Sequence, residues 1–164
     1  MQRTANFRET ESAYSAVHTT KVRTIGVAMH DSPVAMLAWI VDKLYVWTDN
    51  YPWTPAELIT WTLMHWFPGP TTAMNMYREN FPIFANPEKD TNKYVTVPTG
   101  VSLFPKEILV PPRAWVESDY NLVAWEKHAK GGHFAAWEQP DELVGDVVRF
   151  VREHWASASE STKL

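Results

Sequence analysis

The most regular hydrophobic pattern in the chain lies between residues 33 and 47. Apolar side chains recur there at helical spacing, and Ser32 and Pro33 precede them in the order of an N-cap and a first helical residue. The pattern therefore predicts an amphipathic helix over residues 33–47. Its apolar positions are Val34, Leu37, Ile40, Val41, Leu44 and Trp47.

Two further helices are predicted in the first half of the chain. One begins at Thr54, has Pro55 as its first helical residue and ends before the run Pro68-Gly69-Pro70. The next covers residues 71–79. Residues 80–92 combine structure-breaking residues with polar side chains, which predicts a loop and makes this stretch the best candidate for a boundary.

The second half of the chain changes to a β-type pattern. Residues 94–97 predict a short strand that Pro98-Thr99-Gly100 closes, and residues 121–125 predict a second strand. A turn or short helix is expected near residues 105–109, and an amphipathic helix over residues 141–155. This order is typical of the end of a parallel α/β sheet, over which the helices of the first half would lie. The predicted fold class is therefore α/β.

Composition narrows the class of protein. The 164 residues suit one domain, and 15 basic against 19 acidic residues give a net charge of −4, which argues against a non-specific nucleic-acid binder. The absence of cysteine excludes a disulfide scaffold, a thiolate zinc site and a cysteine nucleophile. Nine tryptophans indicate a core or an apolar ligand pocket. Because no signal peptide or membrane-spanning segment is evident, we expect a cytoplasmic protein without a membrane anchor.

His133 is the strongest single candidate for a chemical role. It follows Gly131 and Gly132, just past the second predicted strand, and active sites of α/β sheets lie at the carboxyl ends of strands. Glu107 lies shortly after the first predicted strand, where a carboxylate would orient the imidazole and stabilise its protonated form. The alternatives are a histidine that packs in a turn and a solvated surface carboxylate.

Two tyrosines, Tyr14 and Tyr77, are the next candidates. Two converging phenols, protonated at neutral pH, would hold and protonate a leaving oxygen. The alternative for each is amphipathic packing. Asp31 is interpreted as a helix-capping residue rather than a nucleophile, because Ser32 and Pro33 follow it.

Nothing in the sequence points to a metal or a cofactor. Neither His18 nor His30 has a second ligand at metal-binding spacing, and no histidine pair separated by three residues occurs. A glycine-rich phosphate loop is also absent.

Several separate runs resemble one family. Val97-Pro-Thr-Gly-Val-Ser-Leu-Phe-Pro-Lys-Glu107 and Gly131-Gly-His-Phe-Ala-Ala-Trp-Glu-Gln-Pro140 closely resemble the C-terminal part of epoxide hydrolases of the microsomal type, which have the α/β-hydrolase fold. That group includes fungal, bacterial and juvenile-hormone relatives. Asp31-Ser-Pro-Val-Ala-Met-Leu-Ala-Trp-Ile40 and Met76-Tyr-Arg-Glu-Asn80 resemble the lid segments of the family. The resemblance covers roughly residues 7–155.

The resemblance implies roles for four residues. His133 matches the general base that activates water, and Glu107 matches the acid that orients it. Tyr77 matches one lid tyrosine that donates to the epoxide oxygen, and Tyr14 matches the other less securely. In the family an aspartate at a nucleophile elbow attacks a small apolar epoxide, and the resulting alkyl ester is hydrolysed to a diol without a cofactor. A place in epoxide metabolism and detoxification is also implied.

The resemblance further implies a division of the chain. Residues 1–82 match a helical lid segment, 83–93 a linker loop and 94–156 the C-terminal part of the α/β-hydrolase core with its last two strands, while residues 157–164 are expected to be a disordered tail. The expected geometry places Glu107 within hydrogen-bonding distance of His133. It also turns the Tyr77 hydroxyl toward His133, with Tyr14 nearby.

This sequence departs from the family in one respect. It contains no Gly-x-Asp-x-Gly elbow and no His-Gly-x-Pro oxyanion-hole motif, so the nucleophile has no match in these residues. We expect an epoxide hydrolase by family whose isolated C-terminal fragment is inactive. The alternatives are an inactive remnant or half of a split enzyme, which would bind an apolar ligand or a complementing N-terminal chain, or self-associate.

Overall fold

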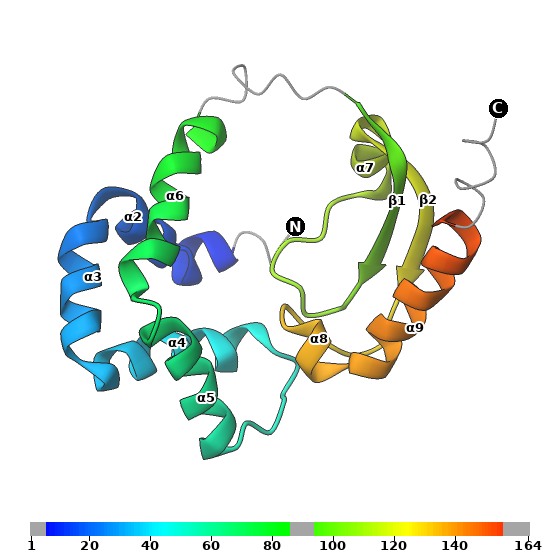
Figure 1. The fold of residues 1–164 in the computed structure, drawn as a ribbon. Helices are drawn as coiled ribbons and strands as arrows, with labels where there is room; N and C mark the ends of the chain where they lie inside the picture. Colours follow the sequence, from blue (N-terminus) through cyan, green and yellow to red (C-terminus); the bar gives the residue numbers. More distant parts are fainter. Residues whose placement is uncertain (1–5, 86–93, 156–164) are drawn as a thin grey trace. The chain divides into compact units, whose positions relative to one another are not determined.

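The computed structural model describes residues 6–85 and 94–155, and the chain divides into two compact units (Figure 1). The first unit comprises Met1–Val46 and Asn50–Thr91, and the second comprises Trp47–Asp49 and Asn92–Leu164. The tail predicted over residues 157–164 and most of the linker predicted over residues 83–93 lie outside the described residues.

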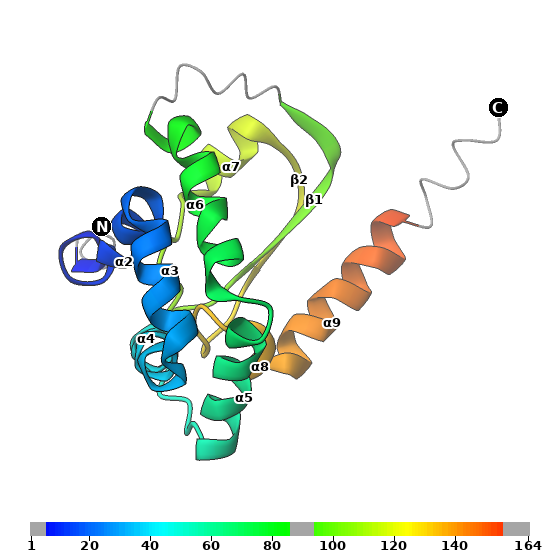
Figure 2. The same ribbon diagram turned by 60° about the vertical axis from the view of Figure 1, so that its left-hand side comes forward.

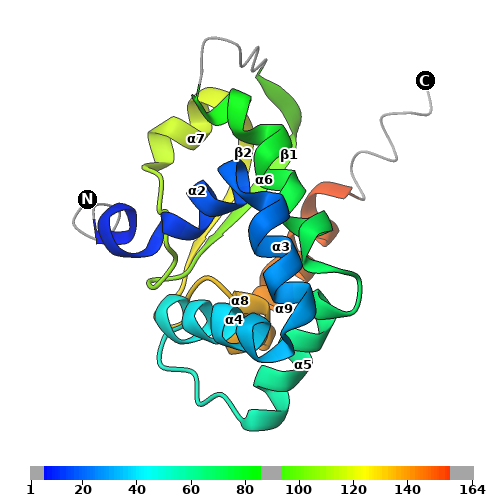
Figure 3. The ribbon, with the colours of Figure 1, turned by 90° about the vertical axis from the view of Figure 1, so that its left-hand side faces the viewer.

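The first unit is helical. Helices α2 and α3 both pack against α6, and Figure 3 shows the three side by side. Its core is formed by Val22, Met29, Met36 and Met74, against which Ile25, Trp39, Ile40 and Trp66 pack. The elements are the π-helical turn η1 (Phe7–Glu11) and the helices α2 (Ala13–Thr20), α3 (Val22–Asp31), α4 (Pro33–Trp47), α5 (Pro55–Trp66) and α6 (Pro70–Ala85).

The predicted bounds of α4 and α5 are confirmed. At the start of α4 the backbone N–H of Ala35 donates to the Ser32 hydroxyl at 3.2 Å. At the start of α5 the Glu57 backbone N–H donates to the Thr54 hydroxyl, and the Glu57 carboxylate accepts from the Thr54 backbone N–H. This reciprocal capping box satisfies donors that a helix start leaves without partners.

Two predictions for the first unit are wrong. Asp31 is the last residue of α3, and the residue that caps α4 is Ser32. The loop predicted from residue 80 begins too early, because α6 continues through Pro82 to Ala85. A proline removes its own N–H donor, but its fixed φ suits a helix, so one more turn can form.

The hydrophobic pattern also gives no helix before residue 33, where the structure has η1, α2 and α3. Neither α2 nor α3 has a side-chain hydrogen bond at its N-cap, so the usual start signal is missing. Among the described residues, no single helix has the length and apolar character to cross a membrane. Within residues 6–85 and 94–155, one pair of helices, α3 and α4, meets that test when taken together, and the two are bent by 113°.

The second unit is built on two strands, β1 (Val95–Leu103) and β2 (Tyr120–Lys127), which pair in parallel as predicted. Figure 2 shows them side by side. A parallel pair needs a crossover, and helix α7 (Arg113–Asp119) lies in that connection. The short helix α8 (Ala135–Glu138) follows, and then α9 (Pro140–Phe150) with the π-helical turn η3 (Val151–Trp155), which together correspond to the helix predicted over residues 141–155.

β1 is longer than predicted, because it continues through Pro98 and Gly100. Its register with β2 shifts between Val95 and Thr99 and again between Thr99 and Gly100. A proline cannot donate to the ladder and occurs in strands at such irregularities. At Gly100 an added Cβ would lie 2.9 Å from the ring of Phe150, so the glycine allows α9 to approach the strand.

Candidate active site

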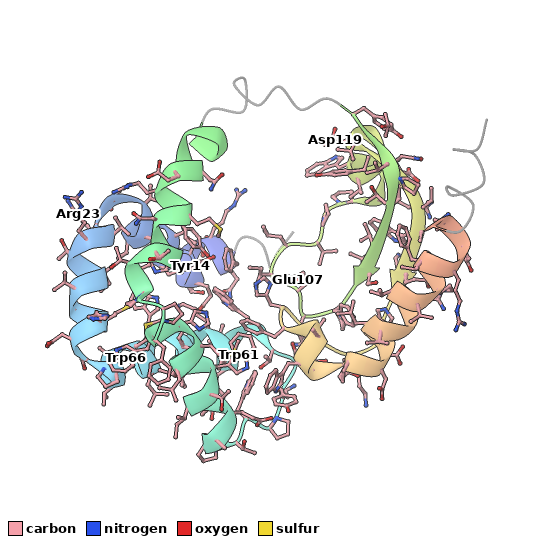
Figure 4. The ribbon with its side chains drawn as sticks, in the orientation of Figure 1. Tyr14, Arg23, Trp61, Trp66, Glu107 and Asp119 are labelled. Atoms are coloured by element: carbon pink, nitrogen blue, oxygen red, sulfur yellow. The ribbon has the colours of Figure 1, made fainter. Side chains whose placement is uncertain are left out.

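The loops that follow the two strands bring Glu107 and His133 together. His133 Nδ1 lies 2.7 Å from Glu107 Oε1, which confirms the predicted hydrogen-bonding distance. The backbones of the loops are also joined, because the Lys106 N–H donates to the Gly131 carbonyl at 2.9 Å. Figure 4 labels Glu107 in the loop after β1. The pair thus lies at the carboxyl ends of β1 and β2, where the sequence placed it.

The electrostatics of the pair favour an ionised Glu107. Burial raises the pKa of its carboxyl, but the hydrogen bond and charge of His133, with the backbone N–H groups of Ile108 and Leu109, outweigh burial and leave the pKa below its usual value. An ionised carboxylate only accepts hydrogen bonds, so His133 Nδ1 is the donor. In the neutral ring Nε2 is then the atom that can take a proton.

Trp47, at the end of α4, contacts the backbone and the ring of His133. Its carbonyl accepts the His133 N–H at 2.9 Å, and its ring lies edge to face with the imidazole at a centroid distance of 5.3 Å. The imidazole also contacts the ring of Phe134, with the two ring centroids 5.2 Å apart. This contact was not predicted from the sequence, because Trp47 belongs to the apolar pattern of a helix.

Tyr14 of α2 and Tyr77 of α6 meet in the first unit. Their rings lie edge to face with centroids 5.7 Å apart, which confirms that the two are neighbours. The pKa of Tyr14 is raised to about 12. Burial is the largest cause, and the charge of Tyr77 and its hydrogen bond with Tyr14 are the others. Figure 4 labels Tyr14. We also expect the Tyr77 hydroxyl to face His133. Because Tyr77 belongs to the first unit and His133 to the second, this expectation stays a prediction.

His18 of α2 completes the tyrosine cluster. Its ring lies 4.9 Å from that of Tyr77 and 5.7 Å from that of Tyr14, centroid to centroid. The imidazole is buried, and neither of its nitrogens has a hydrogen-bond partner among the residues that the structure describes. Burial lowers its pKa, and the charge of Lys43 lowers it further, so the ring is neutral at neutral pH. The spacing of Tyr14 and His18, four residues apart, is the sequence signal that places both on one helix face.

Two other features bear on the chemistry of the site. Within residues 6–85 and 94–155, no group of three or more His, Asp or Glu side chains is placed to hold a metal ion. A hollow of about 410 Å³ lies between β1, β2 and α9, with Ser102 and Trp125 in its lining. Neither Glu107 nor His133 lines this hollow, so it does not mark the place where a molecule would react with the pair.

Comparisons with known proteins point to one family. Sus scrofa epoxide hydrolase 1 is 34% identical over 154 residues, covering 86% of this chain and 34% of that protein. The solved structure of Aspergillus niger epoxide hydrolase matches with a TM-score of 0.79 and 37% identity, over 94% of this chain and 39% of that chain. Juvenile hormone epoxide hydrolase from Bombyx mori gives a TM-score of 0.86 and 28% identity, over 96% and 40%. No family model matches.

The chain spans about a third of the length of the curated relatives it matches. Its two parallel strands with flanking helices fit a C-terminal part of the α/β-hydrolase fold of those solved structures. By sequence and by fold, the chain matches a C-terminal part of epoxide hydrolases of the α/β-hydrolase fold.

Proposed function

We propose that these residues serve the hydrolysis of an epoxide to a vicinal diol, with Glu107 and His133 as the acid–base pair that activates water. The observation that carries the proposal is the 2.7 Å contact between His133 Nδ1 and Glu107 Oε1. An ionised carboxylate at that distance orients the imidazole and stabilises the imidazolium that forms when Nε2 takes a proton.

The proposed reaction has two steps. An aspartate carboxylate attacks an epoxide carbon, the carbon–oxygen bond breaks, and the alkoxide takes a proton from a tyrosine, which leaves an ester of the diol. His133 Nε2 then takes a proton from water, and the hydroxide attacks the ester carbonyl, releasing the diol and restoring the aspartate. One proton of the water ends on the second hydroxyl, and the other returns to the tyrosine through His133 and solvent.

Tyr77 and Tyr14 supply the proton donors of the first step in this proposal. The Tyr14 phenol keeps its proton at neutral pH, because burial first and Tyr77 second raise its pKa to about 12. A hydrogen bond that raises the pKa of Tyr14 stabilises its protonated form, so Tyr14 donates and Tyr77 accepts. The Tyr77 O–H is then the group that donates to the epoxide oxygen.

The nucleophile and the rest of the sheet come from further polypeptide in this proposal. No Gly-x-Asp-x-Gly turn occurs in the 164 residues. Helix α9 and the turn η3 that follows it leave a stripe of valines exposed at helical spacing, a face that suits burial by other polypeptide. The valines are Val144, Val147, Val148 and Val151, with exposed fractions of 58%, 53%, 39% and 45%. By themselves, the 164 residues therefore bind their complement without turning over substrate.

The test uses a chimera in which this chain replaces the matching residues of the Aspergillus niger enzyme. We expect the chimera to form diol from styrene oxide, and His133→Gln, Glu107→Gln and Tyr77→Phe each to lower kcat by about 100-fold or more, as expected for lost acid–base groups. Glu117→Gln, which removes an exposed carboxylate of α7, is the matched control. A folded chimera in which His133→Gln keeps the full rate would contradict the proposal.

A second candidate function is binding without catalysis, which the missing elbow favours. The 164-residue chain is assayed alone for diol formation and, by size-exclusion chromatography, for self-association. We expect no turnover by the chain alone. Turnover of styrene oxide by the chain alone would overturn the need for an external nucleophile, whereas an inactive chimera that is folded would favour the binding function.

A further inference from the structure

Four consecutive backbone N–H groups around His133 all have acceptors. Gly131 N–H donates to Asp49 Oδ2 at 3.0 Å, and His133 N–H donates to the Trp47 carbonyl at 2.9 Å. Gly132 N–H and Phe134 N–H, on either side of His133, both donate to Glu138 Oε1, at 3.1 Å and 3.2 Å. A loop has no ladder to satisfy its backbone, so each of these bonds limits where the loop can lie.

Glu138 is the member of this arrangement that contacts both sides of the loop. Its other carboxylate oxygen, Oε2, accepts the Asp49 N–H at 2.6 Å. One buried carboxylate therefore accepts three backbone N–H groups, two from the His133 loop and one from the segment Trp47–Asp49. Hydrogen bonds to a carboxylate are stronger than bonds between neutral groups.

Gly132, which precedes His133, allows the loop to pack closely against its hydrogen-bond acceptors. An added Cβ at Gly132 would lie 2.5 Å from the Trp47 carbonyl oxygen and 3.1 Å from Glu138 Oε1. The loop is thus pressed against both of its acceptors, and a small change in either moves the backbone of His133. The imidazole has its own fixed partner in Glu107, at 2.7 Å, so a moved backbone loses that contact.

We propose that Glu138 is a positioning residue for His133: its buried carboxylate holds the N–H groups of Gly132 and Phe134 so that the imidazole meets Glu107. The proposal rests on the proposed function only for its effect on catalysis. The geometric part concerns residues of one unit and is tested without substrate. Glu138 lies in α8, a helix that the sequence did not predict. It belongs to the run Gly131–Pro140 that carries the family resemblance, but no role was assigned to it there.

The first test measures the loop in the isotope-labelled 164-residue chain by NMR. Glu138→Gln keeps the size of the side chain but replaces one acceptor oxygen with an N–H₂ donor, so the side chain cannot accept the Gly132, Phe134 and Asp49 N–H groups together. We expect amide exchange of Gly132 and Phe134, or of Asp49 if the amide oxygen takes the place of Oε1, to become at least ~10-fold faster, as for the loss of a bond worth about 1.4 kcal/mol. The pKa of Glu107 should rise, because His133 no longer holds it down. Glu117→Gln should change neither quantity.

The second test measures catalysis in the Aspergillus niger chimera. We expect Glu138→Gln to lower kcat about 10-fold or more with KM unchanged, and Glu138→Asp to restore part of the loss because it keeps the charge. Unchanged amide exchange and an unchanged Glu107 pKa in a folded Glu138→Gln chain would overturn the positioning role. If the loop readouts change and no chimera forms diol, the proposed function fails while the positioning role stands.

Discussion

Tyr14 and Tyr77 lie edge to face, with their ring planes inclined at 84° although the residues come from the first and last long helices of their unit. Tyr77→Phe removes both the charge and the hydrogen bond that help to raise the pKa of Tyr14. We expect that pKa to fall from about 12 toward 10 and to stay above 10, because burial, the largest cause, remains. Titration of tyrosinate absorbance measures it. Tyr45→Phe, at an exposed tyrosine, is the control, and a Tyr14 pKa that stays at about 12 in Tyr77→Phe would contradict the contact.

His133→Gln should raise the pKa of Glu107. Burial, the largest cause, raises that pKa, and the substitution removes the charge and the hydrogen bond that oppose burial. In the parent chain the lowered pKa stabilises the fold above pH 4.5, and this contribution is lost as pH falls through the folded-state pKa. A carbon-13 NMR titration of the Glu107 carboxyl is the measurement. A pKa that does not move would mean that the pair does not form in solution; His30→Gln is the control.

His128 and Ser102 both bond to Asp146 Oδ2 of α9, at 2.7 Å from Nε2 and 2.6 Å from Oγ. Burial raises the pKa of Asp146, but Ser102, His128 and Arg149 outweigh it and leave the pKa below 3.8. We expect Asp146→Asn to lower the free energy of unfolding by about 1–3 kcal/mol. The loss should shrink below pH 3.8, where the parent carboxylate also gains a proton.

Urea unfolding over a range of pH measures the effect of Asp146→Asn. Asp141→Asn removes an exposed carboxylate from the first turn of the same helix and is the matched control. Equal effects of the two substitutions would show that the bonds of Asp146 to Ser102 and His128 contribute nothing to stability.

His18→Phe should stabilise the chain and change its response to pH. The buried imidazole has nitrogens without hydrogen-bond partners, and such groups cost about 1–3 kcal/mol each. Because its pKa is lowered in the fold, the unfolded chain binds a proton below pH 6.5 that the folded chain does not, so stability falls as pH falls below 6.5. His18→Phe should remove that loss in urea unfolding. A variant less stable than the parent at pH 5 would show that a partner satisfies the ring in solution.

Two helical glycines should respond in opposite directions to alanine. In α9 nothing described lies within 4 Å of an added Cβ at Gly145, so Gly145→Ala should stabilise the chain by about 0.5–1 kcal/mol through helix propensity. In α3 an added Cβ at Gly26 would lie 2.2 Å from Thr71 Oγ1 and 3.3 Å from its Cα. Gly26→Ala should therefore destabilise the chain in urea unfolding. Stabilisation by both substitutions would mean that α3 and α6 are not closely packed.

The sequence predicts elements best where start and stop signals are strong. The bounds of α4 and α5 follow from Ser32, Thr54 and the prolines after them, because capping chemistry is local. The helices of residues 7–31 lack such signals and depend on packing against α6, a contact between segments far apart in the chain. The predicted ends of β1 and α6 were too early for a related reason. Each was placed before a proline, Pro98 or Pro82, but tertiary structure tolerates a proline at a strand irregularity or in a last helical turn.

The candidate site divides in the same way. Glu107 and His133 were predictable because each follows a strand at the same edge of a parallel sheet. Trp47 and Glu138 were not, because their importance lies in backbone hydrogen bonds to a loop distant in the sequence. The periodic pattern of a single sequence does not indicate which carbonyl or carboxylate accepts a hydrogen bond from an N–H group far away in the chain.

The three residues Trp47–Asp49 interrupt the first unit in the sequence but belong to the second. Recombination that exchanges the helical first unit as one continuous block would therefore also exchange the Trp47 carbonyl and the Asp49 side chain that hold the loop of His133. When the first unit is exchanged between related chains, the loop of His133 keeps these two partners only if crossover points lie on both sides of Trp47–Asp49. The residues that can be exchanged freely are therefore separated from those that must be kept by a boundary inside the helical segment, at Trp47–Asp49, rather than at its end.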